Sequence, residues 1–321
     1  MTLDRRSALA LALAALAPAV HAQAFPSRPL KLIVNFPPGG AADVIGRALA
    51  TQLADQLKQQ VVVENRPGAN GNIGADAVAK SPADGYTLLM SSGSAMTVNP
   101  FLYTRMPFDA EKDLVPVASV ARVLVFLVTH PSLPVASMAE LVSYAKANPG
   151  KLSYGSPGTG SSPHLAAEMF RRQLQFEATH VPYKGAAPAL TDLLAGQLQF
   201  MFDPGPGLRH VKDGKLRLLA VGSPRRSSQV PDTPTVAELG VTGFDADTTF
   251  GIYAPGGTPA ALVGQLHDEI NKAIASARVQ EVIKSIGGEP AAASRADFIA
   301  AQNRDRDRFG AFIKEAGLKV E

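Results

Sequence analysis

Four loops rich in glycine and serine contain the residues best suited to hold a small ligand. They cover residues 37–42, 91–94, 156–162 and 203–205, and each directly follows an apolar run. Glycine lets the backbone approach a ligand closely, and the N–H groups at a helix start attract an anion. None of the four loops contains lysine or arginine, so we predict that backbone amides and hydroxyls bind a carboxylate without a side-chain cation.

The candidate ligand-binding residues lie in these loops or next to them. They are Phe36, Pro38, Gly39, Gly40, Ala41, Asp43, Ser91, Ser92, Ser156, Gly158, Thr159, Gly160, Ser161, His164 and Asp203. Three or four charge-assisted hydrogen bonds and two helix starts would supply on the order of 8 kcal/mol, which corresponds to micromolar affinity.

Three of these candidates have alternative roles. For Asp43 we favour a role in the first turn of its own helix over contact with the ligand. Asp203 either accepts an amino group or hydroxyl of the ligand or caps the helix after Pro204, and both interpretations remain open. For His164 we favour a packing or helix-start role over that of a base.

Catalytic motifs are incomplete in this sequence. Pro163 stands where a dinucleotide fingerprint beginning at Gly158 needs its third glycine, and both Gly-Lys pairs, at 150–151 and 214–215, are followed by leucine. The histidines after residue 24 show no metal-ligand spacing. We therefore expect no catalytic residue, no cofactor and no metal. A hydrolase built on His164 with Ser161 or Ser162 remains a less favoured hypothesis.

Apolar runs alternate with helical patterns along most of the chain, which is typical of an α/β fold. We predict a two-lobed periplasmic binding protein fold of type II-like form, in which each lobe is a mostly parallel sheet flanked by helices. In a parallel sheet, ligands bind beyond the carboxyl ends of the strands. The glycine loops of the two lobes should therefore face each other across a cleft.

Two extended stretches are expected to cross between the lobes and form a hinge. The first lies within residues 115–130, with the hinge near Ala121 and Arg122, and the second covers residues 247–254. The predicted lobes are residues 25–121 with 251–321, and residues 122–250. Thr258 is expected to cap a long helix that has Pro259 at its first position.

The first 24 residues resemble an export signal. Arg5 and Arg6 precede an apolar stretch of residues 8–20, and small residues lead to a cleavage site near Ala24. The stretch is shorter than the roughly 20 residues needed to span a bilayer. The general secretory route and the twin-arginine route both remain possible. Because the sequence has no cysteine, we expect no disulfide and no lipid anchor. We predict a periplasmic protein.

The composition argues for a folded protein and against a nucleic-acid partner. Hydrophobic residues make up 46% of the chain and charged residues 18%. The net charge of +3 falls to +2 without residues 1–24, which hold two of the 31 basic residues and one of the 28 acidic residues. No basic run is interleaved with aromatic residues, so nucleic acid is not an expected partner.

Seven motifs, in order along the chain, resemble the signatures of the Bug family, the periplasmic binding components of tripartite tricarboxylate transporters. They lie at residues 36–43, 62–68, 84–89, 99–103, 155–165, 180–185 and 254–259. The resemblance implies a two-lobed fold, no catalysis, a small carboxylate or related solute as ligand, and the membrane subunits of a transporter as partners. We expect a monomer. Phe250 occupies a region where many relatives have tryptophan, which leaves the identity of the ligand open.

A second hypothesis keeps the same fold and ligand but changes the partner. The protein would then be a periplasmic sensor subunit that reports its ligand to a membrane signalling kinase. The sequence alone does not separate transport from sensing.

Overall fold

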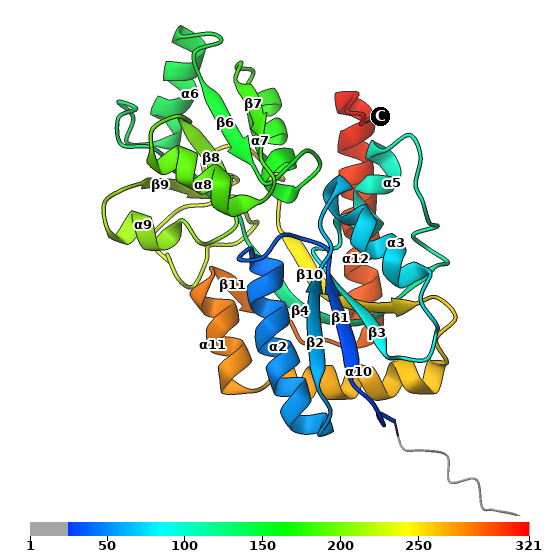
Figure 1. The fold of residues 1–321 in the computed structure, drawn as a ribbon. Helices are drawn as coiled ribbons and strands as arrows, with labels where there is room; N and C mark the ends of the chain where they lie inside the picture. Colours follow the sequence, from blue (N-terminus) through cyan, green and yellow to red (C-terminus); the bar gives the residue numbers. More distant parts are fainter. Residues whose placement is uncertain (1–24, 321) are drawn as a thin grey trace, which may run out of the picture.

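The computed structural model describes residues 25–320. The predicted export signal, residues 1–24, lies outside the described residues. The described chain forms two β-sheets with helices packed against them, and each sheet forms the centre of one half of the molecule (Figure 1). This arrangement matches the predicted two-lobed α/β fold.

The first sheet has the strand order β11-β4-β10-β3-β1-β2. Its strands alternate between two apolar faces, since Leu32 and Val34 pack with helix α2 on one side and Ile33 packs with α3 on the other. In chain order the first part of this lobe contains β1 (Leu30–Val34), α2 (Ala41–Leu57), β2 (Val61–Asn65), the 3₁₀ turn η1 (Ala69–Gly71), α3 (Asn72–Ala79), β3 (Thr87–Ser91), α4 (Ser94–Thr97), α5 (Asn99–Leu102) and β4 (Leu114–Val123).

The second sheet has the strand order β7-β6-β8-β5-β9. Val125 and Leu127 pack with helices α6 and α7, whereas Phe126 and Val128 pack with α8 on the opposite face. Its elements are β5 (Phe126–Thr129), α6 (Met138–Ala147), β6 (Ser153–Ser156), α7 (Ser162–Gln173), β7 (Thr179–Pro182), α8 (Ala186–Leu194), β8 (Phe200–Asp203), α9 (Leu208–Lys212) and β9 (Arg217–Val221).

The last part of the chain returns to the first sheet. It contains β10 (Thr248–Pro255), α10 (Ala260–Ile274), α11 (Ala277–Ser285), β11 (Gly288–Pro290) and α12 (Arg295–Ala316). The predicted cap of α10 is wrong in detail. Pro259 occupies the N-cap position, and the Thr258 hydroxyl donates to the carbonyl of Pro255 instead of capping the helix.

The prediction that each sheet is mostly parallel requires correction, because both sheets are mixed. β1 pairs in parallel with β2 and β3, but β10 is antiparallel to β3 and β4. Likewise β6 is parallel to β7 and β8, whereas β5 is antiparallel to β8 and β9. β10 runs opposite to β1, β2 and β3, and β5 runs opposite to β6, β7 and β8, so these two strands make the antiparallel pairs.

The chain passes between the sheets at two predicted places. β4 continues to Val123, and the buried residues Leu124 and Val125 separate it from β5. β10 pairs with β4 along its whole length and brings the chain back. The change of sheet thus falls slightly after the predicted hinge at 121–122, and the lobe boundaries given above remain a prediction.

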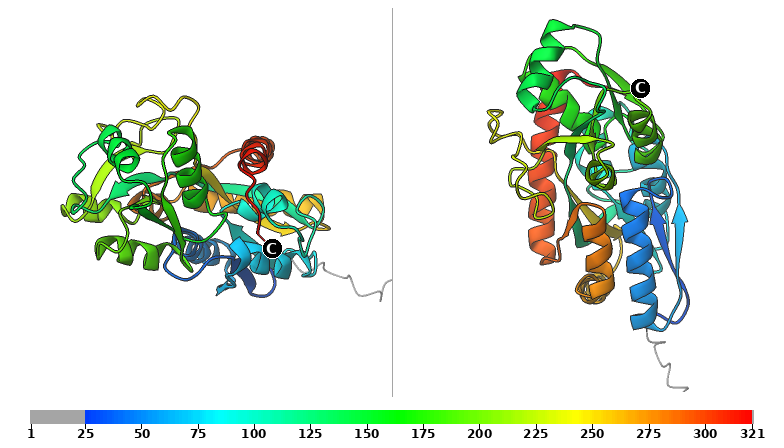
Figure 2. Two further views of the ribbon diagram at one scale, coloured as in Figure 1. Left: turned by 90° about the horizontal axis from the view of Figure 1, so that it is seen from above. Right: turned by 90° about the vertical axis from the view of Figure 1, so that its left-hand side faces the viewer.

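Helix α12 runs alongside both halves of the molecule (Figure 2). Phe309 and Ile313 pack with Leu165 of helix α7. Near the helix end, the guanidinium of Arg172 donates to the carbonyl of Ala316 at 2.9 Å. The C-terminal helix therefore ties the second half of the molecule to the first in addition to the two crossing strands.

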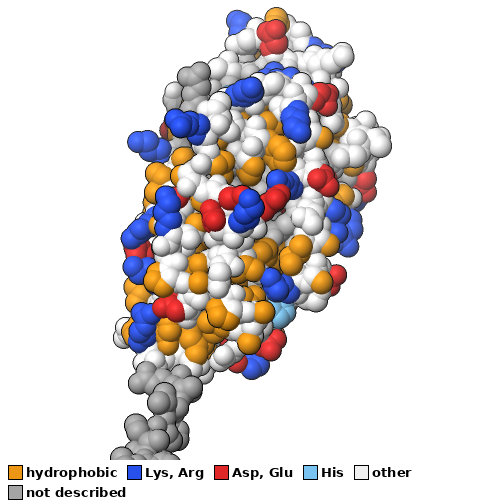
Figure 3. All heavy atoms as spheres, turned by 90° about the vertical axis from the view of Figure 1, so that its right-hand side faces the viewer, with side chains coloured by type: hydrophobic (Ala, Val, Ile, Leu, Met, Phe, Trp, Pro, Cys, Tyr) orange, Lys and Arg blue, Asp and Glu red, His pale blue; other side chains and the backbone are white. Residues whose placement is uncertain are grey.

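Basic and acidic residues occur in similar numbers in the chain, 31 and 28. Figure 3 shows one face, on which basic and acidic side chains are interspersed. Within residues 25–320, none of the helices combines the length and the apolar character that crossing a bilayer requires.

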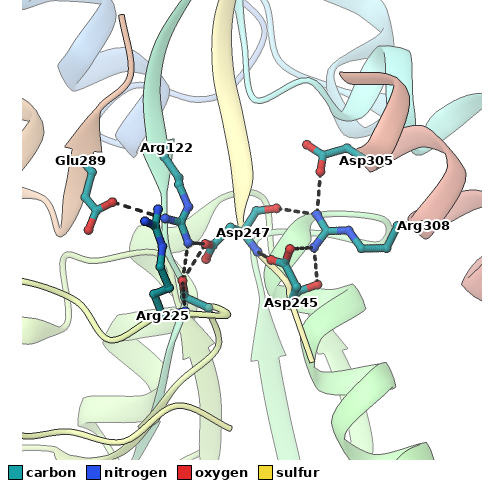
Figure 4. A network of polar contacts seen from close by, with 8 residues as sticks. Arg122, Arg225, Asp245, Asp247, Glu289, Asp305 and Arg308 are labelled. Atoms are coloured by element: carbon teal, nitrogen blue, oxygen red, sulfur yellow. Dashed lines mark hydrogen bonds and ion pairs between the residues drawn. The ribbon is translucent and has the colours of Figure 1, made fainter. Parts of the chain in front are cut away.

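A buried ion-pair network joins the two crossing strands (Figure 4). Arg122 of β4 pairs with Asp247, which directly precedes β10, and donates to the hydroxyl of Ser223 at 2.5 Å. Arg308 of α12 donates to the carbonyls of Asp245 and Asp247 at 2.6 and 3.0 Å. The residues that connect the two halves are thus held by charge-assisted hydrogen bonds.

The carboxyl group of Asp247 titrates abnormally because it is buried. Burial raises its pKa to about 7, although the positive charge of Arg122 acts in the opposite direction. Without Arg122 the pKa would be higher still.

We predict that Arg122→Met lowers the free energy of unfolding by about 3–5 kcal/mol at pH 8, where Asp247 must either stay charged without its cation or take up a proton. The loss should shrink towards pH 5, because Asp247 is then protonated in both proteins and no longer needs the cation. Urea unfolding at the two pH values measures this. Arg105→Met is the control, since the side chain of Arg105 is exposed and lies outside this network. An equal loss at both pH values would contradict the assigned role of Asp247.

Candidate functional site

A cavity of about 120 Å³ lies between the two halves of the molecule. Loops and helix starts of both halves form its walls, together with the crossing strands β4 and β10. Its lining residues are Phe36, Pro37, Pro38, Gly40, Ala41, Ala42, Ser92, Val123, Pro157, Ser161, Ser162, Pro163, Lys184, Gly185, Ala186, Ala187, Pro188, Pro204 and Phe250.

Three helices begin at this cavity. The first residues of α2, α7 and α8 all belong to its lining, and these helices have 17, 12 and 9 residues. No side chain caps any of the three by a hydrogen bond. Because the first N–H groups of a helix have no partner within the helix, each start offers donors and a partial positive charge. The arrangement suits an anion.

The structure brings six of the predicted site residues to the cavity wall. They are Phe36, Pro38, Gly40, Ala41, Ser92 and Ser161. The first four precede or open α2, Ser92 follows β3, and Ser161 is the N-cap residue of α7. The predicted glycine loops of the two lobes thus lie on opposite sides of one cavity, as the sequence led us to expect.

The remaining predicted residues, Thr159 among them, do not belong to the lining. Several of their amides are already used: Gly39 donates to Asp43, Gly158 to the Ser156 hydroxyl, and Gly160 to Nδ1 of His164. These bonds fix the shape of the loops but remove those N–H groups from the set available to a ligand. The donors that remain at the cavity are those of the helix starts.

Asp43 is buried at the start of α2. Its carboxylate accepts hydrogen bonds from Gly39, Asn65 and Arg47. Burial alone would raise its pKa, but these hydrogen bonds outweigh burial, and the pKa lies below its ordinary value. This environment agrees with the favoured role of Asp43 in its own helix turn.

Asp203 is fully buried beneath the loop that contains Pro204. One carboxylate oxygen accepts from the amides of Gly205 and Gly207 at 2.8 and 2.7 Å, in the loop before α9, whose N-cap residue is Gly207 and which has no side-chain cap. Burial raises the pKa of Asp203 to about 6 despite these two bonds. Asp203 supports the loop, while the adjacent Pro204 faces the cavity.

Ser91, Ser156 and His164 are buried as well. The Ser91 hydroxyl binds Asn35 and the amide of Gly93. The Ser156 hydroxyl lies 2.7 Å from Nε2 of His180, whose ring packs against that of His164 with 4.1 Å between centroids. Burial and the neighbouring His180 lower the pKa of His164 to about 3. His164 is therefore neutral at pH 7, as its acceptance of the Gly160 amide requires.

The hydroxyl of Ser161 donates to the carbonyl of Gly158 at 2.7 Å. Among the described residues, no hydrogen bond joins His164 to Ser161 or Ser162. The geometry thus gives no nucleophile–base pair for the hydrolase hypothesis.

Comparison with known proteins identifies the family. The model of the tripartite tricarboxylate transporter family receptor matches residues 45–318. The chain belongs to this family. It is 41% identical over 316 residues to Protein BugT of Bordetella pertussis. The aligned region covers 97% of this chain and 96% of BugT. The resemblance to the Bug family is thereby confirmed.

Solved structures agree with this assignment. The R. palustris protein Rpa4515, determined with adipate, superposes with a TM-score of 0.87 at 36% identity and covers 92% of this chain and all of that one. The periplasmic binding protein BugD superposes with a TM-score of 0.85 at 32% identity, over 92% of this chain and all of BugD. The family is one of periplasmic solute-binding receptors, and these likenesses confirm the predicted fold.

One cationic side chain of the receptor belongs to the cavity lining, contrary to the expectation of a site without cations. Lys184 follows strand β7, and the start of α8 comes directly after it. The site predicted from the sequence consists of loops without lysine or arginine, and residues 184–188 lie outside it. The signal was present, because residues 180–185 form one of the family motifs and precede a helix.

Val123 and Phe250 were also missing from the predicted site. They lie in the crossing strands β4 and β10, and the loop-based argument had no reason to include strand residues. The departure from the family pattern near Phe250 pointed towards the cavity, but only the structure places the ring in its wall.

Two glycines of the second lobe lie against the first lobe across the cavity. A Cβ atom at Gly160 would lie 2.4 Å from Leu102 Cδ2 and 2.8 Å from Asn70 Nδ2, and one at Gly185 would lie 3.3 Å from Pro37 Cγ. The two lobes are therefore in contact here, and an alanine at residue 160 would require the side chains of Leu102 and Asn70 to move.

We predict that Gly160→Ala weakens ligand binding at least about tenfold, because the added methyl group prevents full closure of the lobes. Gly150→Ala is a matched control: its φ of +72° resembles the +84° of Gly160, but no atom lies within 4 Å of the added methyl. Titration calorimetry gives the affinity, and thermal unfolding gives the strain common to both variants. Equal affinities for the two variants would mean that this contact is unimportant for closure.

Proposed function

We propose that this receptor binds a small carboxylate-bearing solute in the cavity between its lobes and delivers it to the membrane subunits of a tripartite tricarboxylate transporter. The observation that supports this proposal most directly is that three helices without a side-chain cap begin at one cavity. Family membership and the adipate in the related Rpa4515 structure support the same class of ligand.

The binding residues follow from the geometry. The amides that open α2, α7 and α8 donate to the carboxylate, and the ammonium group of Lys184 adds a positive charge at the same end of the site. A helix start contributes about 0.3–2 kcal/mol to anion binding and a charge-assisted hydrogen bond about 1.5–3 kcal/mol. A few such interactions account for micromolar affinity without a cofactor or a catalytic step.

Domain closure explains how binding is communicated to a partner. The receptor closes around its solute about the two crossing strands, so that the membrane subunits meet a different surface when the site is filled. We further propose that the receptor acts as a monomer in the periplasm after removal of residues 1–24. The sensor and hydrolase hypotheses gain no support from the site.

We predict that Gly40→Val abolishes carboxylate binding. Gly40 lines the cavity with a φ of −79°, so valine is tolerated by the backbone, and its side chain would occupy the space in front of the α2 amides. The loss should be at least about a hundredfold in Kd, because an anion displaced from the helix start loses several hydrogen bonds.

Gly264→Val is the matched control, since residue 264 lies in α10 with no atom within 4 Å of the added Cβ. Thermal unfolding against a panel of carboxylates measures binding, because a ligand specific for the folded state raises Tm. Failure of every carboxylate to raise the Tm of the wild-type receptor would contradict the proposed function.

A further inference from the structure

The wall of the cavity at the crossing strands is apolar. Val123 and Phe250 belong to the hydrophobic core of the first lobe, and Phe36 packs against the same core. Val123 is 1% exposed and Phe250 7% exposed. Each of these two side chains therefore presents only a small part of its surface to the cavity, whose lining also includes Pro204 of the second lobe.

The polar side chains of the lining are few and partly occupied. Apart from Lys184, they are the serines 92, 161 and 162. The hydroxyl of Ser92 lies 3.1 Å from that of Ser94, and the hydroxyl of Ser161 is bound to the carbonyl of Gly158. Ser162 and Lys184 lie at the helix starts, where the carboxylate is expected. Ser91 pairs with Gly251 in β10, so the neighbouring Ser92 lies close to Phe250 and supplies the polar side-chain group of the described lining on that side.

We infer that the solute is a carboxylate with an unsubstituted apolar body, whose body packs against Phe250, Val123 and Phe36. This inference rests on the proposed function, because the carboxylate at the helix starts fixes which end of the solute faces this wall. Near Phe250, a hydroxyl or amino group on the body would meet only the Ser92 hydroxyl among the described lining side chains, and that hydroxyl already contacts Ser94. Burial of a polar group with unmet hydrogen bonds is costly. Phe250 is the residue that determines specificity.

The test uses acids that differ only by a hydroxyl at the end remote from the carboxylate. Benzoate is compared with 4-hydroxybenzoate, and hexanoate with 6-hydroxyhexanoate, by titration calorimetry on the mature receptor. The wild-type receptor should bind the unsubstituted member of at least one pair about tenfold or more tightly. The pair that shows the preference tells whether the body is aromatic or aliphatic.

Two variants of Phe250 locate the origin of the preference. Phe250→Leu keeps the wall apolar and should retain the preference even if both acids bind more weakly. Phe250→Thr offers a hydroxyl partner and should reduce the preference to about threefold or less. Thermal unfolding verifies that each variant is folded, and the wild-type ratio still decides the question if Phe250→Thr is not.

The outcomes separate this inference from the proposed function. Equal or tighter binding of the hydroxylated acids by the wild-type receptor overturns the inference but leaves carboxylate binding intact. A preference that persists in a folded Phe250→Thr variant overturns the assignment to Phe250. If no acid in this set or in a wider carboxylate panel binds the wild-type receptor, the proposed function itself fails.

Discussion

The first amides of a helix cannot find acceptors within their own helix, and in this receptor three helices leave such amides facing a single cavity. At many helix starts, the side chain of the N-cap residue accepts hydrogen bonds from these amides. Here residues 40 and 185 are glycines, and the Ser161 hydroxyl is turned back to the carbonyl of Gly158. The donors consequently depend on something outside the protein chain, and an anionic solute is the partner that suits them.

The loops around the cavity are built so that their own polar groups do not compete for the solute. Asp43 binds the amide of Gly39, and His164 binds that of Gly160. Both acceptors are buried, which keeps them out of contact with an incoming carboxylate. The burial of His164 also lowers its pKa, so the ring stays neutral and able to accept a hydrogen bond. The buried residues thus prepare a site whose wall presents mainly donors and apolar groups.

The complete site contains residues of both lobes. Residues of the first lobe supply the α2 start, residues of the second supply those of α7 and α8, and only approach of the lobes brings the three together. The crossing strands on which this motion depends are joined by the Arg122–Asp247 pair, with Arg308 of α12 holding the adjacent backbone. A pair at this position fixes the spacing of the two strands.

Much of this arrangement was predictable from the sequence, and the failures have physical causes. The apolar runs and the glycine loops predicted the strands, the helix starts and their convergence, because strand ends in an α/β sheet meet at one edge. The sequence could not tell which amides are already bonded within a loop, since the partners of Gly158 and Gly160 depend on side-chain positions. Lys184 lies outside the predicted site because that prediction rests on loops without lysine or arginine. Phe250 was left out of the predicted site because strand residues reach a ligand only where a strand crosses between lobes.

A crystal structure of the receptor purified with its natural solute tests the central claim most directly. The account predicts a carboxylate group between the lobes, with its oxygens within about 3.2 Å of amides that open α2 and at least one of α7 and α8. A bound solute that turns no anionic group towards these helix starts, or one that lies outside the cavity, would contradict it.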